Sequence, residues 1–148
     1  MYSEVKGNAW NILNSYSALC LTTNGTVTKE GKCVMGRGIA LEAKNRISGI
    51  DSVLGKLIVK NGNVVQFIGQ FPSGVKLFSF PVKHNWFETA DINLIKESAV
   101  QLMRAVEHYK LQSVLLPRPG CGNGKLDWAD VSKELAEILD ERIHIVSF

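Results

Sequence analysis

The chain has few cysteines and no long apolar run. Cys20, Cys33 and Cys121 are its only cysteines, none of them form a C-x-x-C pair, and three cannot all join in disulfides. This usage is typical of a reducing cytoplasm. No apolar stretch approaches the roughly 20 residues of a membrane span, and the first residues lack the basic and apolar regions of a signal or transit peptide. The sequence therefore predicts a cytoplasmic protein without membrane contact.

Charge and metal-ligand patterns are also sparse. The formal net charge is only +3, which permits an anionic ligand but does not by itself indicate a nucleic-acid-binding protein. No cluster of His, Cys and Asp has the spacing of metal ligands, so we expect neither a metal nor a cofactor. At 148 residues the chain is long enough for a full core and too short for two ordinary domains. We expect one domain over residues 1–148.

The most informative segment is SVLLPRPGCGNGKLDW, residues 113–128. Its first four residues predict a short buried strand, which two prolines end. Glycines then follow at positions 120, 122 and 124, and Asp127 offers an N-cap to a helix beginning at Trp128. A strand, a glycine-rich loop and a helix N-terminus together place bare N–H groups around an anion. The segment predicts a phosphate-binding loop, although it lacks the Lys-Ser or Lys-Thr ending of a P-loop.

Strands and helices alternate along the chain. The patterns predict strands at residues 18–23, 64–71, 77–82, 113–116 and 143–148, and helices at 38–47, 91–109 and 128–141. This alternation predicts an α/β fold whose mostly parallel sheet is covered on both faces. Ligands of such sheets bind beyond the carboxyl ends of the strands. The loops after the strands at 18–23 and 113–116 are therefore the candidate sites.

The first of these loops also contains glycines at a helix start. Gly36 and Gly38 lie in CVMGRGIA, just before the helix predicted at 38–47. Two glycine loops that meet two helix N-termini would suit a pyrophosphate. A dinucleotide-binding fingerprint fits badly, because the third glycine is missing and a long polar insert separates the loop from its strand.

These motifs resemble those of the macrodomains, which are ADP-ribose-binding modules. The resemblance rests on Asn24, GRGIA at 36–40 and LLPRPGCGNGKLDW at 115–128, and it spans nearly the full chain. The segment FPVKHNW at 80–86 is similar to the branch that removes ADP-ribose from protein or nucleic acid, including antitoxin glycohydrolases that act on ADP-ribosylated DNA. The resemblance implies a three-layer α/β/α fold with a mixed six-stranded sheet and a ligand cleft across both glycine loops.

The resemblance also implies a set of site residues. Lys83 is implied as the catalytic residue, near the anomeric carbon of the distal ribose. The implied ligand contacts are Asn8, Ala9, Asn24, Gly36, Arg37, Gly38, Ile39, Pro119, Gly120, Cys121, Gly122, Asn123 and Gly124, with the phosphates on the N–H groups of 36–39 and 120–124. Two positions depart from the family pattern. Asn8 stands where many members have Asp, and Gly124 stands where some members have Asp. An amide oxygen can still accept from adenine, but an acid-assisted covalent lysine route is not expected.

Several residues allow a plainer interpretation. Asn24 could be a turn residue, and Lys83 could be a surface lysine that only steers anions. Cys121 fits a packed side chain better than the nucleophile of a Cys121–His84 dyad. Arg37 could be a solvated helix-start residue. The three tryptophans are more often core residues than stacking platforms.

At the level of function, we expect a monomer that hydrolyses ADP-ribose from DNA or protein. Two alternatives keep both glycine loops: an ADP-ribose 1″-phosphate phosphatase and a reader that binds ADP-ribose without catalysis. A nicotinamide-dependent oxidoreductase fits least, because of the poor fingerprint.

Overall fold

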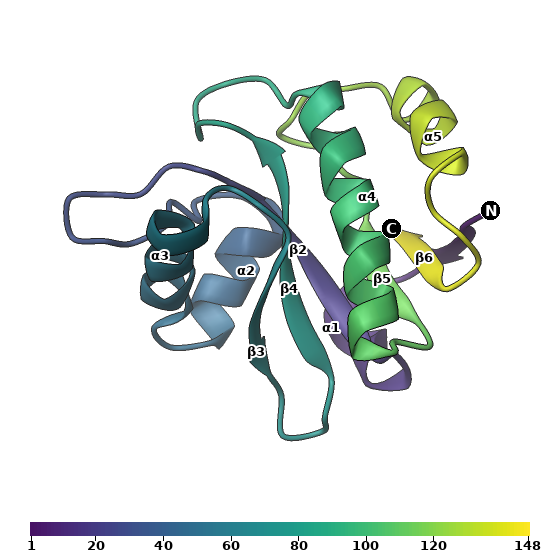
Figure 1. The fold of residues 1–148 in the computed structure, drawn as a ribbon, viewed down its shortest axis with the longest axis horizontal. Helices are drawn as coiled ribbons and strands as arrows, with labels where there is room; N and C mark the ends of the chain where they lie inside the picture. Colours follow the sequence, from purple (N-terminus) through teal and green to yellow (C-terminus); the bar gives the residue numbers. More distant parts are fainter.

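A mixed six-stranded sheet forms the centre of the computed structural model, which describes all residues, Met1–Phe148 (Figure 1). The strand order is β1-β6-β5-β2-β4-β3, and every neighbouring pair is parallel except β3 and β4. The strands are β1 Ser3–Lys6, β2 Ala18–Asn24, β3 Gln66–Gln70, β4 Lys76–Lys83, β5 Val114–Pro117 and β6 Ile143–Ser147. The helices are α1 Ala9–Ile12, a 3-10 turn Leu13–Ser15, α2 Gly38–Arg46, α3 Ile50–Asn61, α4 Ile92–Tyr109 and α5 Trp128–Ala136.

Helices cover both faces of the sheet, which confirms the predicted three layers. One apolar core of 19 buried residues lies between the sheet and α4 and α5, and a second of 14 lies between the sheet and α1, α2 and α3. Strand β2 contributes side chains to both cores, because successive side chains of a strand point to opposite faces of the sheet. Ala18 and Cys20 belong to the first core, and Leu19 and Leu21 to the second. The apolar run ALCL thus marks a strand buried on both sides.

The predicted helices agree with the observed ones except at the carboxyl end of α5. Helix α4 begins after Asp91, whose carboxylate accepts from the Asn93 N–H at 2.9 Å, and its buried residues follow the predicted helical period. Helix α5 also has its predicted cap at Asp127, but it ends at Ala136 rather than at residue 141. The side chain of Asp140 accepts from the Arg142 N–H at 2.9 Å, and this local turn replaces further helix.

Helix α3 was not predicted, and Gly55 explains its weak signal. Glycine is unfavourable inside helices, so Gly55 lowers the helix propensity of residues 50–61. In the fold, a Cβ at Gly55 would collide with the carbonyl group of Gly31. The glycine therefore allows α3 to pack directly against the backbone of the loop that leads into the site.

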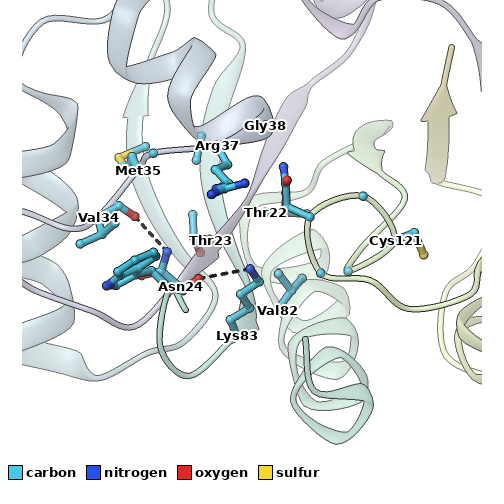
Figure 2. A pocket seen from close by; sticks show the side chains of 17 residues that line it. Thr22, Thr23, Asn24, Val34, Met35, Arg37, Gly38, Val82, Lys83 and Cys121 are labelled. Atoms are coloured by element: carbon cyan, nitrogen blue, oxygen red, sulfur yellow. Dashed lines mark hydrogen bonds between the residues drawn. The ribbon is translucent and has the colours of Figure 1, made fainter. Parts of the chain in front are cut away.

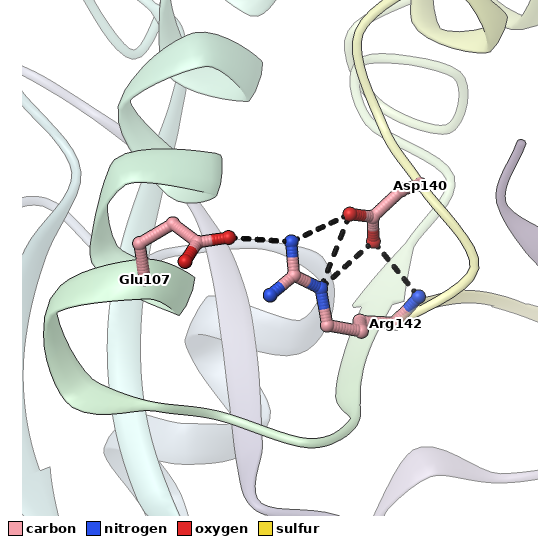
Figure 3. Close-up of polar contacts among 3 residues, drawn as sticks. All are labelled: Glu107, Asp140 and Arg142. Atoms are coloured by element: carbon pink, nitrogen blue, oxygen red, sulfur yellow. Dashed lines mark hydrogen bonds and ion pairs between the residues drawn. The ribbon is translucent and has the colours of Figure 1, made fainter.

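An arginine joins the end of α4 to the turn before β6 (Figure 3). The Arg142 guanidinium donates to both carboxylate oxygens of Asp140, at 2.6–3.1 Å, and to Glu107 Oε1 at 2.8 Å. The hydrogen bonds from Arg142 hold the pKa of Asp140 below its usual value. Asp140 therefore stabilises the fold above its unfolded-state pKa of about 4, and this contribution is lost as pH falls through the lower folded-state pKa.

We expect Asp140→Asn to lower the free energy of unfolding at pH 7 but not under strongly acidic conditions. The amide keeps the turn but loses the charge, and the pair is partly exposed, so the shift in the urea midpoint should be on the order of a few tenths of a molar. Urea titrations of both proteins at several pH values measure it. An equal difference between the proteins at every pH would contradict this assignment.

Candidate functional site

A cavity of about 520 Å³ opens at the carboxyl ends of β2, β4 and β5 (Figure 2). Parallel sheets bind ligands at this edge, and both predicted glycine loops reach it. Of the residues implied at the site, ten line the cavity: Asn24, Gly36, Arg37, Gly38, Lys83, Gly120, Cys121, Gly122, Asn123 and Gly124. Asn8, Ala9, Ile39 and Pro119 are not part of its lining.

Both loops present backbone N–H groups that have no partner within the protein. None of the N–H groups of residues 36–40 or 120–124 donates a hydrogen bond to another protein atom. The first set includes the opening turn of α2, where the helix dipole adds positive potential. The loops also approach one another, since a Cβ on Gly38 would lie 3.8 Å from Asn123 Nδ2. The arrangement can therefore bind two linked anionic groups.

The loop glycines fall into two structural groups. Gly38 and Gly120 have φ values of +57° and +74°, which strain any other residue. A Cβ on Gly124 would collide with the backbone of Gly120. Gly36 and Gly122 differ, because a Cβ on either would meet no atom within 4 Å and neither has a positive φ. The protein itself does not require glycine there, but a ligand close to the backbone would.

Lys83 ends β4 inside a cluster of positive charges. It pairs with Asn24 in the sheet register, and its Nζ donates to the Trp86 carbonyl at 3.3 Å. Partial burial, and then the charges of Arg37 and Lys125, lower the pKa of Lys83. Neither Asp nor Glu lines the cavity. The site is therefore electrostatically suited to an anion.

The Asn24 side chain organises the loop between β2 and α2. Its Nδ2 donates to the Val34 carbonyl at 3.0 Å (Figure 2). Its Oδ1 accepts from the Thr26 N–H, also at 3.0 Å. This is the turn role that the sequence left open. The amide still has one lone pair and one N–H unused, so Asn24 can both shape the loop and contact a ligand.

Cys121 and His84 each have another partner. The Cys121 thiol donates to the Pro119 carbonyl at 3.3 Å, and burial raises its pKa to about 11. In Figure 2 its sulfur points away from Lys83. His84 Nε2 instead lies 2.8 Å from Asp91 Oδ2 on the surface. The arrangement does not supply a thiolate nucleophile activated by histidine.

Asn8 acts as the N-cap of α1. Its Oδ1, the atom that the resemblance assigns to adenine, accepts from the Trp10 N–H at 3.0 Å. The helix therefore fixes the orientation of this amide, leaving one oxygen lone pair for a ligand.

Trp86 corrects the expectation that all three tryptophans belong to the core. Trp10 and Trp128 do pack against the two cores, but Trp86 is 48% exposed and lines the cavity. Further lining residues that the sequence did not indicate are Thr22, Thr23, Val34, Met35, Ala40 and Val82. Five of these side chains do lie inside the quoted motifs, Val34, Met35 and Ala40 in CVMGRGIA and Val82 and Trp86 in FPVKHNW, but the motifs do not show which of their side chains face the cavity.

Comparisons with known proteins identify relatives, although no family model matches the chain. The chain is 32% identical over 114 residues to a DNA ADP-ribosyl glycohydrolase of Mycobacterium tuberculosis and 27% identical over 112 residues to one of Thermus aquaticus. These alignments cover 73% and 72% of this chain. The chain spans only about a third of each relative, 32% and 31% of their lengths.

Solved structures give the same family over the full chain. The macrodomain of Mycobacterium tuberculosis DarG superposes with a TM-score of 0.79 at 28% identity, covering 99% of both chains. That of Thermus aquaticus DarG gives 0.80 at 25% identity, covering 100% of this chain and 98% of the other. Thermosipho africanus DarTG in complex with ADP-ribose shares the fold, with a TM-score of 0.77 at 18% identity over 97% of this chain and 41% of that one.

Two further structural facts concern membranes and metals. No helix is both long and apolar enough to cross a membrane, and no three His, Cys, Asp or Glu side chains gather where they could hold a metal ion.

The sheet order, the two glycine loops and the full-length similarity agree on one assignment. The chain is a macrodomain, and it resembles the macrodomains of the DarG proteins.

Proposed function

We propose that this macrodomain binds ADP-ribose and hydrolyses the bond between ADP-ribose and an acceptor. The observation that carries the proposal is the meeting of two loops of free N–H groups in one cavity that ends at Lys83. The name of the curated relatives, DNA ADP-ribosyl glycohydrolase, favours DNA as the acceptor. We also propose that residues 1–148 form one domain, that it is cytoplasmic and that it acts as a monomer.

In the proposed complex, each loop binds one phosphate. The N–H groups of 36–39 and 120–124 would donate to the pyrophosphate, and Arg37 would add charge. The distal ribose would lie near Asn24 and Asn123, with its anomeric carbon toward Lys83. The cavity volume of about 520 Å³ is within the usual range for small-molecule sites.

The chemistry must differ from that of a two-carboxylate glycosidase. Such enzymes use a pair of Asp or Glu side chains beside the bond that breaks, whereas no acid lines this cavity. Position 124 cannot easily supply one, because a side chain at Gly124 would collide with the Gly120 backbone. In the proposed reaction, the loops position the sugar and the Lys83 ammonium donates a proton to the leaving group as its bond to the anomeric carbon breaks. Water attacks that carbon and gives its proton to the resulting Lys83 amine, which restores the ammonium.

We expect free ADP-ribose to bind more tightly than AMP or NAD. AMP lacks the second phosphate and so leaves one loop without its ligand. NAD places a cationic nicotinamide ring on the distal ribose, toward the positive charges of Arg37, Lys83 and Lys125. Calorimetric titration of the three ligands measures this order, and NAD binding equal to or tighter than ADP-ribose would contradict the proposed pose.

A substrate panel tests the activity itself. The panel contains ADP-ribosylated DNA, ADP-ribosylated Glu and Ser peptides, O-acetyl-ADP-ribose and ADP-ribose 1″-phosphate. The proposal expects free ADP-ribose to be released from ADP-ribosylated DNA. Inorganic phosphate from the 1″-phosphate alone would identify a phosphatase, and tight binding without any product would identify a reader.

A further inference from the structure

Two exposed aromatic side chains lie where the acceptor would leave the cavity. Trp86 and Phe87 are 48% and 69% exposed, and their rings are perpendicular with centroids 5.8 Å apart. Trp86 lines the cavity beside Lys83, whereas Phe87 lies outside its lining. Large apolar side chains left together on a surface commonly mark a binding site.

The backbone beneath these rings is held in place. The Trp86 N–H donates to Thr26 Oγ1 at 3.0 Å, and the Trp86 carbonyl accepts from Lys83 Nζ at 3.3 Å. Thr26 Oγ1 also lies 3.3 Å from Asn85 Oδ1. The Trp86 backbone is therefore fixed to the loop that follows β2 and to the lysine, although its ring is not buried.

Two further cationic side chains lie near Lys83, at the end of the cavity that Trp86 also lines. Arg37 and Lys125 are both close enough to Lys83 to lower its pKa. Lys125 is exposed and has a φ of +67°, a left-handed conformation that costs a lysine about 1 kcal/mol. Glycine at this position would relieve the strain. The lysine therefore lowers the free energy of unfolding.

Exposed aromatic rings beside cations are how proteins bind single-stranded nucleic acids. Bases stack on the rings and the cations lie along the phosphates. A peptide acceptor carrying Glu or Ser would gain from the cations but would have no aromatic face to stack. In a duplex, both faces of each base are already covered, so stacking requires a base to be flipped out.

We propose that Trp86 and Phe87 form a stacking platform for the bases of a single-stranded DNA acceptor, with Lys125 near its phosphates. The position of the acceptor rests on the proposed function, which places the anomeric carbon toward Lys83. The platform makes the enzyme selective for single strands and sets the affinity for the conjugate without taking part in bond breaking.

The kinetic test compares an ADP-ribosylated single-stranded oligonucleotide with free ADP-ribose. We expect Phe87→Ala to raise KM for the oligonucleotide about tenfold, the scale of one lost base stack, with kcat unchanged. Its Kd for free ADP-ribose should stay at the wild-type value, because Phe87 does not line the cavity. Trp86→Phe, which keeps a ring, should retain a lower KM than Trp86→Ala. The matched control is Thr89→Ala, an exposed and uncharged residue of the same segment, and it should behave as wild type.

A binding test needs no hydrolysis. An unmodified, mixed-sequence single-stranded DNA should quench tryptophan fluorescence of the wild type, whereas its duplex should not, and Trp86→Phe should remove the quenching. Lys125→Gly should weaken binding and reduce its salt dependence without lowering the unfolding temperature.

The two proposals fail separately. Quenching by the single strand without hydrolysis of any conjugate would reject the activity and keep the platform. Hydrolysis with a wild-type KM in both Phe87→Ala and Trp86→Ala, or equal quenching by duplex and single strand, would reject the platform and keep the activity.

Discussion

Gly122→Glu is expected to weaken ADP-ribose binding strongly while the domain stays folded. A Cβ at Gly122 meets no atom within 4 Å and its φ is not positive, so the backbone can accept a side chain. A carboxylate there would project among the free N–H groups of 120–124 and repel a phosphate. Lost charge-assisted hydrogen bonds and like-charge repulsion should together cost about 2–4 kcal/mol, which weakens binding roughly 30- to 1,000-fold. Calorimetry measures the binding, and thermal unfolding measures the fold.

Two kinds of control separate charge, bulk and loop conformation. Gly122→Gln has the same shape without the charge, so its affinity should lie between those of the wild type and Gly122→Glu. Gly120→Ala and Gly124→Ala should instead lower the unfolding temperature, because one position has a φ of +74° and the other faces the Gly120 backbone. A folded Gly122→Glu that binds ADP-ribose as tightly as wild type would move the phosphates away from this loop.

Helices and strands could be predicted where the sequence has a clear apolar run or a clear helical repeat of apolar residues. Strand β2 has a continuous apolar run, and α4 repeats apolar residues over 18 positions, so both were found within a residue or two. Helix α3 was not found, because the close approach to Gly31 requires Gly55 inside it. Strand β1 is predicted by the resemblance alone, because two of its four residues are half-buried and the other two are exposed, so no apolar run marks it.

The candidate site was predictable through its glycines and less so through its side chains. The spacing of the glycines indicates the two loops, because glycine has no side chain and leaves the backbone N–H groups accessible. Both loops reach the cavity. The lining by Thr22 and Val82 depends on which face of a strand end turns toward the cavity, which the alternation does not specify. Aromatic residues are usually buried, which favours the core for Trp86. The structure instead holds the Trp86 backbone at the rim of the cavity through hydrogen bonds to Thr26 and Lys83.

Lys83→Ala is expected to reduce turnover of the ADP-ribosylated substrate by a factor of roughly 10² or more, the usual scale for a lost acid–base group. The affinity for free ADP-ribose should change little, because the loop N–H groups carry the phosphates. The matched control is Lys76→Ala, which removes a lysine from the opposite end of the same strand and should leave turnover unchanged. Unchanged turnover in Lys83→Ala would make this residue a surface lysine and leave either a reader or a hydrolase of another design.

The pH profile and Lys83→Arg distinguish two roles for the lysine. As an ammonium ion it assists the leaving group, so turnover should fall as pH rises through its pKa, which lies below the usual value of about 10.5. Arginine would then preserve part of the activity, since it stays charged at every accessible pH. As a free amine, Lys83 would attack the aldehyde of the ring-opened sugar, turnover would rise with pH, and arginine would be as inactive as alanine. We expect the first pattern, because no carboxylate lines the cavity to assist an attacking amine, whereas in the ammonium route Lys83 itself gives a proton to the leaving group and takes one from the water.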